Sequence, residues 1–521
     1  MKKFLLLTLA SCMGLASYGA DAKWTASVNG IFDNDEAIYS GNVVAMDAFG
    51  NTYVAGQYNK DEVTINNTKY EGIGKSAYIV KYDANGVAQW SVNLKGAATI
   101  TAIACDNNNS EPYIYVAGTF ADEVVLGNNQ GAQSQTIKGA KNAYDDSYVA
   151  DQISSFIVKY RATDGCLSTT TTFIPEEIAE ALNLGGDAFF EISDIYVYDS
   201  TVYCAARYGG ITKHGTAEFN GYSVYNPEWF CTFYCKSASV FTLSLGLAEC
   251  NNKISCGPGK DLGENDVVSN ATGVNMLVDG STVYAAFSAL GPVSVKEKNF
   301  AAIDVDCEAG VGSYIFRRLG GNTSTYAAIV NADIDEFKPF APAAMAVDGD
   351  KLLCLTYQTI SNGESKEGQT SVYTLKTTQF TSNSEKVSKA YAEGDVEYSV
   401  ISKAAYTNNN WVCALRGLNK GGETVAFKAG ALNGSTFTAA PAADAVTFAA
   451  DDKVAVYATV SGQGVEYAQY ENAFSGIYDI IADDENAPVE YFNIQGVRVD
   501  NPDNGIYIRR QGSKVSKVLV K

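Results

Sequence analysis

The feature that most constrains the fold is the segment 41–96, in which four runs of strand-forming residues alternate with turn sequences. The runs are Val43–Met46, Thr52–Ala55, Ala77–Tyr82 and Val87–Leu94. DAFGN separates the first two runs and DANG separates the last two, and Asp, Asn and Gly are residues that tight turns favour. Consecutive strands joined by tight turns pair with one another. The segment therefore predicts one four-stranded antiparallel sheet.

The turn in the middle of this unit recurs along the chain. A turn residue precedes a short β run at Asp47, Asp106, Asp199, Asp279, Asp348, Asn408 and Asp451. Repeated four-stranded units are typical of β-propellers, in which the sheets are arranged radially. We therefore predict an all-β fold, a β-propeller of seven four-stranded blades. The units are unevenly spaced, and we expect the extra length to lie in loops.

The composition agrees with this fold class. Gly (47) and Tyr (33) are abundant, Pro (10) is scarce, and the apolar content of 46% suits a packed globular protein. The formal net charge of −21 disfavours nucleic acid and anionic membranes as partners, because both would be repelled.

The two ends of the repeated region match in sequence. KWTASVNG, which contains Trp24, is similar to QWSVNLKG, which contains Trp90, and each Trp precedes a Gly by six residues. The seventh unit has no recognisable fourth strand. We therefore predict that Trp24–Val28 supplies this strand near Val454–Tyr470, which closes the ring and removes an open sheet edge.

Residues 1–22 have the features of a secretory signal peptide. Lys2-Lys3 is followed by an apolar stretch and by an Ala-Asp-Ala cleavage site, so the mature chain is expected to begin at Lys23. This predicts export to the periplasm, the cell surface or the extracellular space. LASC at residues 9–12 also has the form of a lipobox, and lipid anchoring at Cys12 is the alternative interpretation.

After the signal peptide we predict three parts. Residues 23–472 form the β-propeller domain, 473–486 a linker and 487–521 a small β tail. The tail is basic in an otherwise acidic chain and is small for an independent core. Its predicted strands are Val489–Asn493, Val497–Val499, Ile506–Arg510 and Val515–Val520.

Two insertions interrupt the repeats. Asn128–Asp151 is polar and predicts a loop within the second unit. Pro175–Leu182 begins with Pro and acidic residues, which predicts a short helix between units.

One part of the repeat resembles a known family. GKSAYIVKYDANGVAQW, with AMDAFGNTYVAG before it, resembles the seven-bladed β-propeller repeat (SBBP) family. The match is good in the first unit, fair in the second, where Ser155–Tyr160 reads SFIVKY, and faint beyond. The resemblance implies a propeller of an exported bacterial protein and assigns no catalytic residues.

The end of the chain resembles a second group of sequences. Residues 489–521 are similar to the C-terminal sorting tails of bacteria that use type IX secretion, through FNIQGVRV, NGIYI and a final basic hairpin. The tail is shorter than a full sorting domain. The resemblance implies association with the outer membrane or the cell surface through this tail.

The cysteines divide into two groups. Cys204, Cys354 and Cys413 occupy the position that Val54 has in the first unit, so we predict that they are core residues. We predict that Cys250 and Cys256 flank a short loop, and this pair is the best candidate for a disulfide.

No arrangement of residues predicts catalysis. The single histidine, His214, excludes a metal site with several histidines, and we predict a surface or packing role for it. The acidic groups lack the twelve-residue loop ending in Glu that would indicate Ca²⁺, so we predict solvated turns. These groups are Asp33/Asp35/Glu36, Asp304/Asp306, Asp333/Asp335/Glu336 and Asp483/Asp484/Glu485. We therefore assign no catalytic residue, no metal and no cofactor.

The sequence leaves three functions open. The first is a non-enzymatic propeller that binds a protein or a glycan, to which loop aromatics such as Tyr208, Tyr222, Tyr225 and Trp229 would contribute. The second is a polysaccharide hydrolase or lyase that uses carboxylates around the central channel. The third is a purely structural surface protein. Three or more carboxylates converging with an Arg or Tyr on one channel mouth would favour the enzyme, whereas a lining of small and apolar groups would favour the binding protein.

Overall fold

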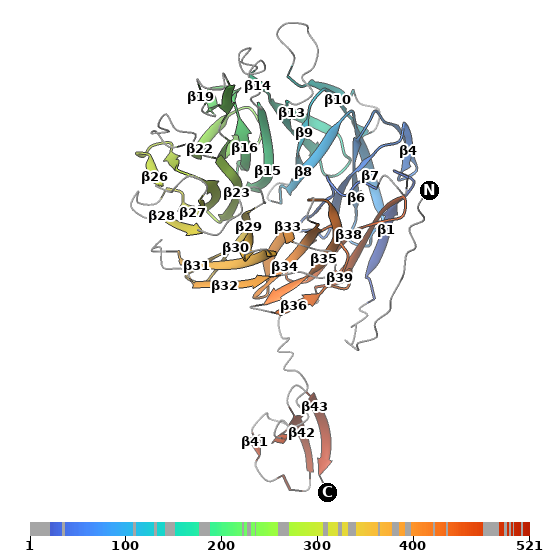
Figure 1. The fold of residues 1–521 in the computed structure, drawn as a ribbon. Coiled ribbons are helices and arrows are strands. Elements are labelled where there is room, and N and C mark those ends of the chain that lie inside the picture. The colour runs from blue at the N-terminus through green and yellow to red at the C-terminus, as the bar shows by residue number, and fades with distance from the viewer. Residues whose placement is uncertain are drawn as a thin grey trace. The chain divides into compact units, whose positions relative to one another are not determined.

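The structure is a computed structural model of an all-β chain (Figure 1). It describes residues 21–33, 37–107, 111–129, 133–140, 152–176, 188–220, 223–226, 231–234, 236–258, 270–305, 311–320, 326–331, 340–362, 365–377, 385–390, 398–419, 422–433, 436–472, 489–493, 498–499, 502–503, 505–511 and 514–520. The chain divides into two compact units between Ala473 and Phe474. Residues 1–20 of the predicted signal peptide and all of the predicted linker lie outside the described residues.

Seven antiparallel sheets, numbered 1 to 7 here in chain order, make up most of the described part of the larger unit. Their first strands are β2 (Val43–Met46), β8 (Ala98–Cys105), β15 (Phe189–Tyr198), β23 (Asn270–Asp279), β29 (Ala341–Asp348), β33 (Tyr398–Thr407) and β37 (Thr447–Ala450). Their second strands are β3 (Thr52–Tyr58), β9 (Tyr113–Phe120), β16 (Thr201–Gly209), β24 (Thr282–Leu290), β30 (Lys351–Asn362), β34 (Asn410–Leu418) and β38 (Val454–Ser461).

The third and fourth strands complete these sheets. The third strands are β6 (Ser76–Tyr82), β12 (Ser154–Arg161), β21 (Ser237–Ser244), β27 (Gly312–Arg318), β31 (Ser365–Lys376), β35 (Thr424–Asn433) and β39 (Gly464–Glu471). The fourth strands are β7 (Ala88–Lys95), β13 (Leu167–Phe173), β22 (Cys250–Pro258), β28 (Tyr326–Asn331), β32 (Glu385–Ala390), β36 (Thr436–Ala439) and, in sheet 7, β1 (Trp24–Val28).

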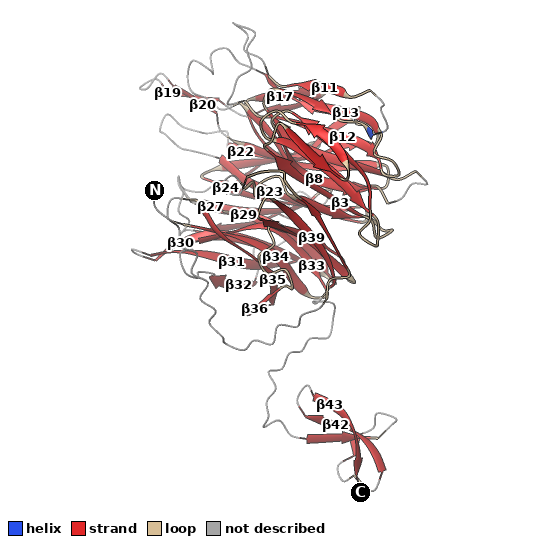
Figure 2. Cartoon of the chain, turned by 90° about the vertical axis from the view of Figure 1, so that its right-hand side faces the viewer, coloured by secondary structure: helices blue, strands red, loops and turns tan. Residues whose placement is uncertain are grey.

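The first strands of successive sheets contact one another in a closed circuit. The contacts run from β2 through β8, β15, β23, β29 and β33 to β37, and β37 in turn contacts β2. In the view turned by 90°, strands make up most of the described chain (Figure 2). This arrangement is compatible with a β-propeller.

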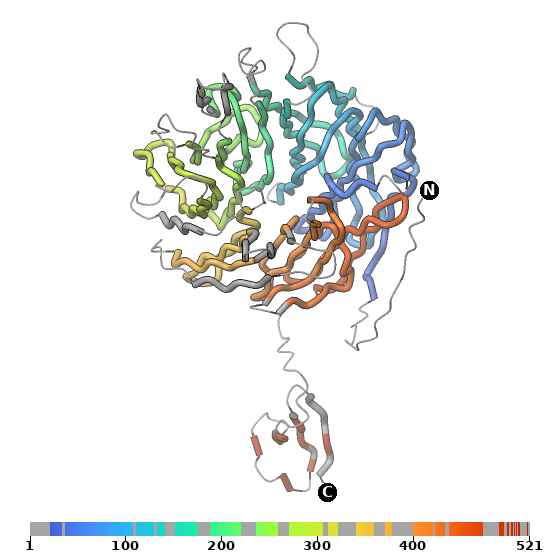
Figure 3. The backbone as a smooth tube through the Cα atoms, in the orientation of Figure 1, coloured from blue at the N-terminus to red at the C-terminus, as the bar shows by residue number. Residues whose placement is uncertain are grey.

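The N-terminal strand pairs with the last sheet, as the sequence predicts. Trp24 lies opposite Gln469 and Val28 opposite Val465, in an antiparallel pairing of β1 with β39 (Figure 3). The Trp24 ring packs against Gly86, where a Cβ atom would lie 2.7 Å from the ring. Trp90 packs in the same way against Gly165. The two similar sequences around Trp24 and Trp90 therefore have the same packing role.

The tight turns at one face follow from local hydrogen bonds. The Asp47 carboxylate accepts bonds from the N–H groups of Phe49 and Asn51 at 2.9 Å. Asp83 and Asp451 each accept two backbone N–H groups of their own turns. Such Asx turns stop one strand and start the next, and we refer to the face that carries them as the tight-turn face.

The longer connections between second and third strands leave the opposite face. They contain hairpins that extend the preceding sheets: β10 (Glu123–Leu126) and β11 (Gln135–Lys138) join sheet 1 through β7, and β25 (Val293–Glu297) and β26 (Ile303–Val305) join sheet 3 through β22. The loop predicted for Asn128–Asp151 therefore contains a strand. The remaining short strands are β4 (Glu62–Ile65), β5 (Thr68–Glu71), β14 (Pro175–Glu176), β17 (Ile211–His214), β18 (Ala217–Asn220), β19 (Ser223–Asn226) and β20 (Cys231–Tyr234).

The prediction of a helix over Pro175–Leu182 is wrong for its first two residues. Pro175 and Glu176 form β14, which pairs with β17, and the remainder of the predicted helix lies outside the described residues. A strand edge that accepts Pro outweighs the acidic pattern here.

The smaller unit is a four-stranded sheet. Its strands are β40 (Val489–Phe492), β41 (Arg498–Val499), β42 (Gly505–Gln511) and β43 (Lys514–Val520), in the order β41-β40-β42-β43. The four strands predicted for the tail are therefore confirmed, with ends shifted by one residue. Among the described residues of both units, no helix is long and apolar enough to span a membrane.

Candidate functional site

A cavity of about 410 Å³ lies where the first strands of all seven sheets come together. Small and apolar side chains such as Val43, Ala102, Val274 and Ala344 line it, but polar atoms provide the larger share of its exposed surface. Pockets that bind small ligands are typically 300–1,000 Å³, and placed polar groups fix the orientation of the ligand. This cavity, which we term the central cavity, is the strongest candidate site in the described part of the chain.

Bulges in the first strands shape the central cavity. The register of β8, β15, β23, β29 and β33 shifts at one extra residue each, namely Thr101, Ser193, Thr272, Ala343 and Ser402. All five line the cavity. Bulges turn side chains away from the regular pleat, which places these residues towards the channel. The Ser402 hydroxyl donates to the carbonyl oxygen of Val446 at 3.1 Å, so the bulges also connect neighbouring sheets.

Arg207 is the main cation of the central cavity and is incompletely paired. Its Nη1 donates to the Thr272 carbonyl at 2.8 Å, and its Nη2 lies 3.7 Å from the Glu191 carboxylate. Its Nε has no hydrogen-bond partner. A guanidinium has five N–H donors, so Arg207 retains unused donor capacity next to the cavity.

Asp194 and Lys403 form a second charged layer. Each follows the bulged residue of its strand, on β15 and β33, and both line the cavity. Asp194 is surrounded by protein although its channel side keeps some exposure. This desolvation raises its pKa, and the charge of Lys403 opposes the shift. The Ile195 N–H donates to the Asp194 carboxylate at 3.0 Å.

Tyr357 and Arg416 occupy positions in their sheets that are equivalent to the position of Arg207. Each of the three lies opposite a first-strand residue that is two positions before the bulge, in the pairs Glu191–Arg207, Ala341–Tyr357 and Val400–Arg416. Burial raises the pKa of Tyr357, and Arg207 and Arg416 both oppose this rise, so both cations are within electrostatic reach of it. Arg416 is exposed and forms no ion pair with any described residue.

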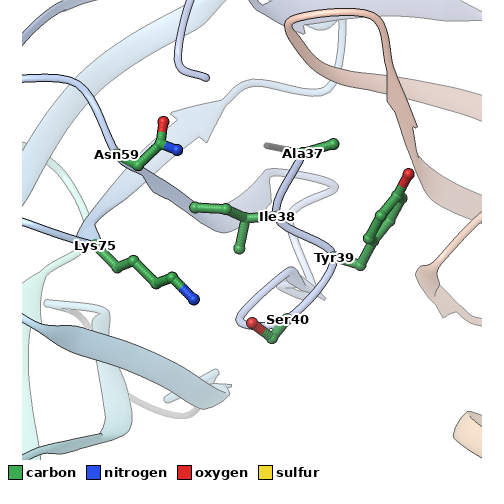
Figure 4. A pocket seen from close by; sticks show the side chains of 6 residues that line it. All are labelled: Ala37, Ile38, Tyr39, Ser40, Asn59 and Lys75. Carbon is green, nitrogen blue, oxygen red and sulfur yellow. The ribbon is translucent and has the colours of Figure 1, made fainter. Parts of the chain in front are cut away.

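A second, shallower pocket of about 450 Å³ lies near the start of sheet 1. Figure 4 shows Ala37, Ile38, Tyr39 and Ser40 on one side and Asn59 and Lys75 on the other. The Tyr39 ring packs on Phe427, with centroids 5.0 Å apart. Residues 34–36, which immediately precede this wall, lie outside the described chain, so we assign no site here.

The residues singled out from the sequence are mostly structural. His214 stacks on Phe173 with ring centroids 4.7 Å apart, and burial lowers its pKa, which confirms a packing role. Tyr208 is 1% exposed and hydrogen-bonded to Ser239, so it is a core residue. The side chains of Tyr222, Tyr225 and Trp229 lie outside the described residues.

The expected disulfide is not formed. Cys250 and Cys256 are free and buried, and both lie on β22. Six residues along one strand span about 20 Å, which is too far for a bond between the two sulfurs. The predicted loop between them is in fact strand. Cys204, Cys354 and Cys413 are at most 1% exposed, as predicted for core residues.

The acidic groups do not form a metal site in the described part of the chain, where no three His, Cys, Asp or Glu residues come together suitably. Asp33 lies 3.3 Å from Lys60, and Asp304 is exposed on β26. Asp35, Glu36 and Asp306 lie outside the described residues, as do the groups at 333–336 and 483–485.

Sequence reasoning missed Glu191, Asp194, Arg207, Tyr357 and Arg416. They come from three separate repeats, so no local motif joins them. For Arg207, Tyr357 and Arg416 the shared position within the unit was the available signal, since each follows a recognisable middle stretch of its second strand (YCAAR, LCLTY and VCALR).

Comparisons with models of protein families and with curated proteins found no match. Among solved structures, the chain is similar to the acylaminoacyl peptidase of Pyrococcus horikoshii at 10% identity and a TM-score of 0.28, over 79% of this chain and 57% of the peptidase. It is also similar to the NanB sialidase of Streptococcus pneumoniae in complex with 2-[(3-chlorobenzyl)ammonio]ethanesulfonate, at 9% identity and a TM-score of 0.30, over 88% and 71% of the two chains. The chain thus spans little more than half of the peptidase. At these TM-scores neither similarity carries an argument about function.

Proposed function

We propose that this chain is an exported, seven-bladed β-propeller that binds a protein or a glycan and is not an enzyme. The seven sheets would be its blades, with β1 completing the last of them. The closed circuit of first strands and the pairing of Trp24 with Gln469 support this architecture. The resemblance of the first unit to the SBBP family supports the same interpretation.

The lining of the central cavity carries the functional part of the proposal. Two carboxylates, Glu191 and Asp194, lie there in a lining whose exposed surface is mainly polar. Each has a cation nearby, Arg207 for Glu191 and Lys403 for Asp194. Fewer than the three carboxylates that we set as the criterion for an enzyme are therefore present in the described lining, and the chemistry suits recognition of polar groups.

The tail gives the proposal its location. Its basic four-stranded sheet, together with its similarity to type IX sorting tails, supports retention at the outer membrane or cell surface. In this proposal residues 1–22 direct export, with lipidation of Cys12 as the alternative anchor.

A glycan and protein-ligand array tests the proposal, run on the mature chain from Lys23 in parallel with a screen for polysaccharide cleavage. We expect saturable binding and no cleavage products. Cleavage of any substrate by the wild type but not by Glu191→Gln or Asp194→Asn would overturn the non-enzymatic assignment.

A polysaccharide hydrolase or lyase remains the second candidate because of one observation. Asp194 is a carboxyl of raised pKa that shares a cavity with another carboxyl, Glu191. Glycosidases combine a carboxylic acid that is protonated near neutral pH with a second, ionised carboxylate. The cleavage screen decides between the two candidates.

A further inference from the structure

From the central cavity, and resting on the proposed binding function, we infer that the mouth formed by Arg207, Tyr357 and Arg416 binds the carboxylate of an acidic sugar. The ligand is a uronate-bearing glycan, recognised through charge-assisted hydrogen bonds to the two guanidinium groups. The mouth is on the face of the long connections, opposite the tight-turn face.

The three side chains share one level of the structure. Each belongs to the second strand of its sheet and lies opposite a first-strand residue located two positions before a bulge. Arg207 and Tyr357 line the cavity, and Arg416 is exposed at the same level. A ligand that enters at this level meets Arg207 and Tyr357 in the lining, and Arg416 is near enough to act electrostatically on Tyr357.

The chemistry of these groups selects a carboxylate. A guanidinium binds a planar carboxylate through two parallel N–H donors, and the two Nη atoms of Arg207 have donors to spare, since Nη1 makes one hydrogen bond and Nη2 is 3.7 Å from its nearest anion. Arg416 has no ion pair within the described chain. Tyr357 offers a ring on which a sugar can stack and a hydroxyl that can hydrogen-bond to it. The overall charge of −21 opposes anions at long range, so these local cations must be what recognises the acid.

The deeper layer of the cavity suits the rest of a sugar. Asp194 and Lys403 offer an acceptor and a donor, and Ser193 and Ser402 add hydroxyl groups. A neutral hydroxylated ring needs such paired donors and acceptors. The cavity of about 410 Å³ is within the range of small-ligand sites.

The ends of the ring-forming chain leave this mouth open. The N–H of Lys23 donates to the Gln469 carbonyl, and Asn472 donates to the Asp451 carbonyl within a tight turn. Both ends of the ring therefore emerge at the tight-turn face.

Calorimetry with trigalacturonate and with its fully methyl-esterified form tests the inference. The ester keeps the shape of the sugar and removes its charge. We expect the acid to bind at least tenfold more tightly than the ester. We also expect Arg207→Met and Arg416→Met each to lower the affinity for the acid at least tenfold. The Arg416→Met variant is expected to fold normally, because the Arg416 side chain is exposed, so a loss of binding in this variant cannot be attributed to misfolding. Arg207→Lys keeps the positive charge and is expected to retain part of the affinity.

Arg161→Met is the matched control, because Arg161 pairs with Asp164 in a tight turn on the opposite face. Equal affinity for acid and ester, no binding of either, or unchanged affinity in both mouth variants would overturn the inference. Binding of a neutral glycan alone would overturn it and leave the proposed function intact. Cleavage of trigalacturonate would instead reject the non-enzymatic function while retaining the ligand class.

Discussion

Two Arg–Glu pairs of this protein show how differently the same residue types are used. Arg317 and Glu297 join sheet 4 to the hairpin β25–β26, with N–O distances of 2.9 and 3.2 Å and side chains only 2% and 11% exposed. The other Glu297 oxygen accepts the N–H of Gly320. In the central cavity, Arg207 and Glu191 are 3.7 Å apart and are 33% and 40% exposed.

This difference distinguishes a charged pair that stabilises the fold from one whose arginine can still bind a ligand. Buried ions require close partners, because an unpaired charge in a low-dielectric surrounding is strongly destabilising. The pair at the sheet junction meets this requirement in full, whereas the cavity pair is more widely spaced, is partly exposed and leaves donors unused. Partial pairing is what allows Arg207 to exchange Glu191 for an external carboxylate.

The largest expected effect comes from breaking the buried pair. Arg317→Met should lower the free energy of unfolding by about 3–5 kcal/mol, because it leaves the Glu297 carboxylate buried without its cation. Urea denaturation measures this loss. Replacing both residues, as Arg317→Met with Glu297→Leu, should recover most of it. A loss below about 1 kcal/mol in the single variant would show that burial does not distinguish the two pairs.

Lys81 provides an intermediate case, in which a buried cation has a neutral partner. Its Nζ donates to the Ala162 carbonyl of sheet 2 at 2.8 Å, and Lys159 donates in the same way to Leu245 of sheet 3 at 3.1 Å. Lys81→Met should cost about 1–2 kcal/mol, since the Trp90 Nε1 still donates to the Ala162 carbonyl.

The pH dependence of this variant gives a second measurement. Burial lowers the pKa of Lys81, so the unfolded state holds this proton up to a higher pH than the folded state. Wild-type stability should therefore rise relative to Lys81→Met as the pH increases from the folded towards the unfolded pKa. A constant difference between the two proteins over that range would contradict the assignment.

The cavity pair should matter little for stability. Arg207→Met is expected to cost about 1 kcal/mol or less, because a half-exposed pair contributes little and one hydrogen bond to Thr272 is lost. Thermal unfolding beside the Arg317→Met variant tests the contrast directly. Equal destabilisation by the two variants would assign Arg207 to the framework and remove it as a ligand-binding residue.

The features that could be predicted from the sequence are those that depend on interactions between residues close together in the chain. Asp47 and Asp83 organise their own turns, so four-stranded sheets could be read from them, and the similarity around Trp24 and Trp90 located the strand that pairs with β39. The hairpins β10–β11 and β25–β26 were missed, because each pairs with the sheet before its own unit. Arg207, Tyr357 and Arg416 were missed for a related reason. They belong to different repeats, and only the packing of the sheets against one another places them at equivalent positions around the central cavity.

Asp194 gives the smallest effect and completes the comparison, because it is a cavity carboxyl whose pKa is raised by burial. Its folded pKa lies above its unfolded pKa, so the folded state binds the proton more tightly, and wild-type stability should fall as the pH rises between the two values. Asp194→Asn removes this dependence and should become the more stable protein at neutral pH, but not in acid below both pKa values. Denaturation of both proteins at several pH values measures the crossing. A wild-type protein that gains stability over Asp194→Asn as the pH rises would mean that Lys403 outweighs the desolvation, and Asp194 would then belong with the paired charges of the framework.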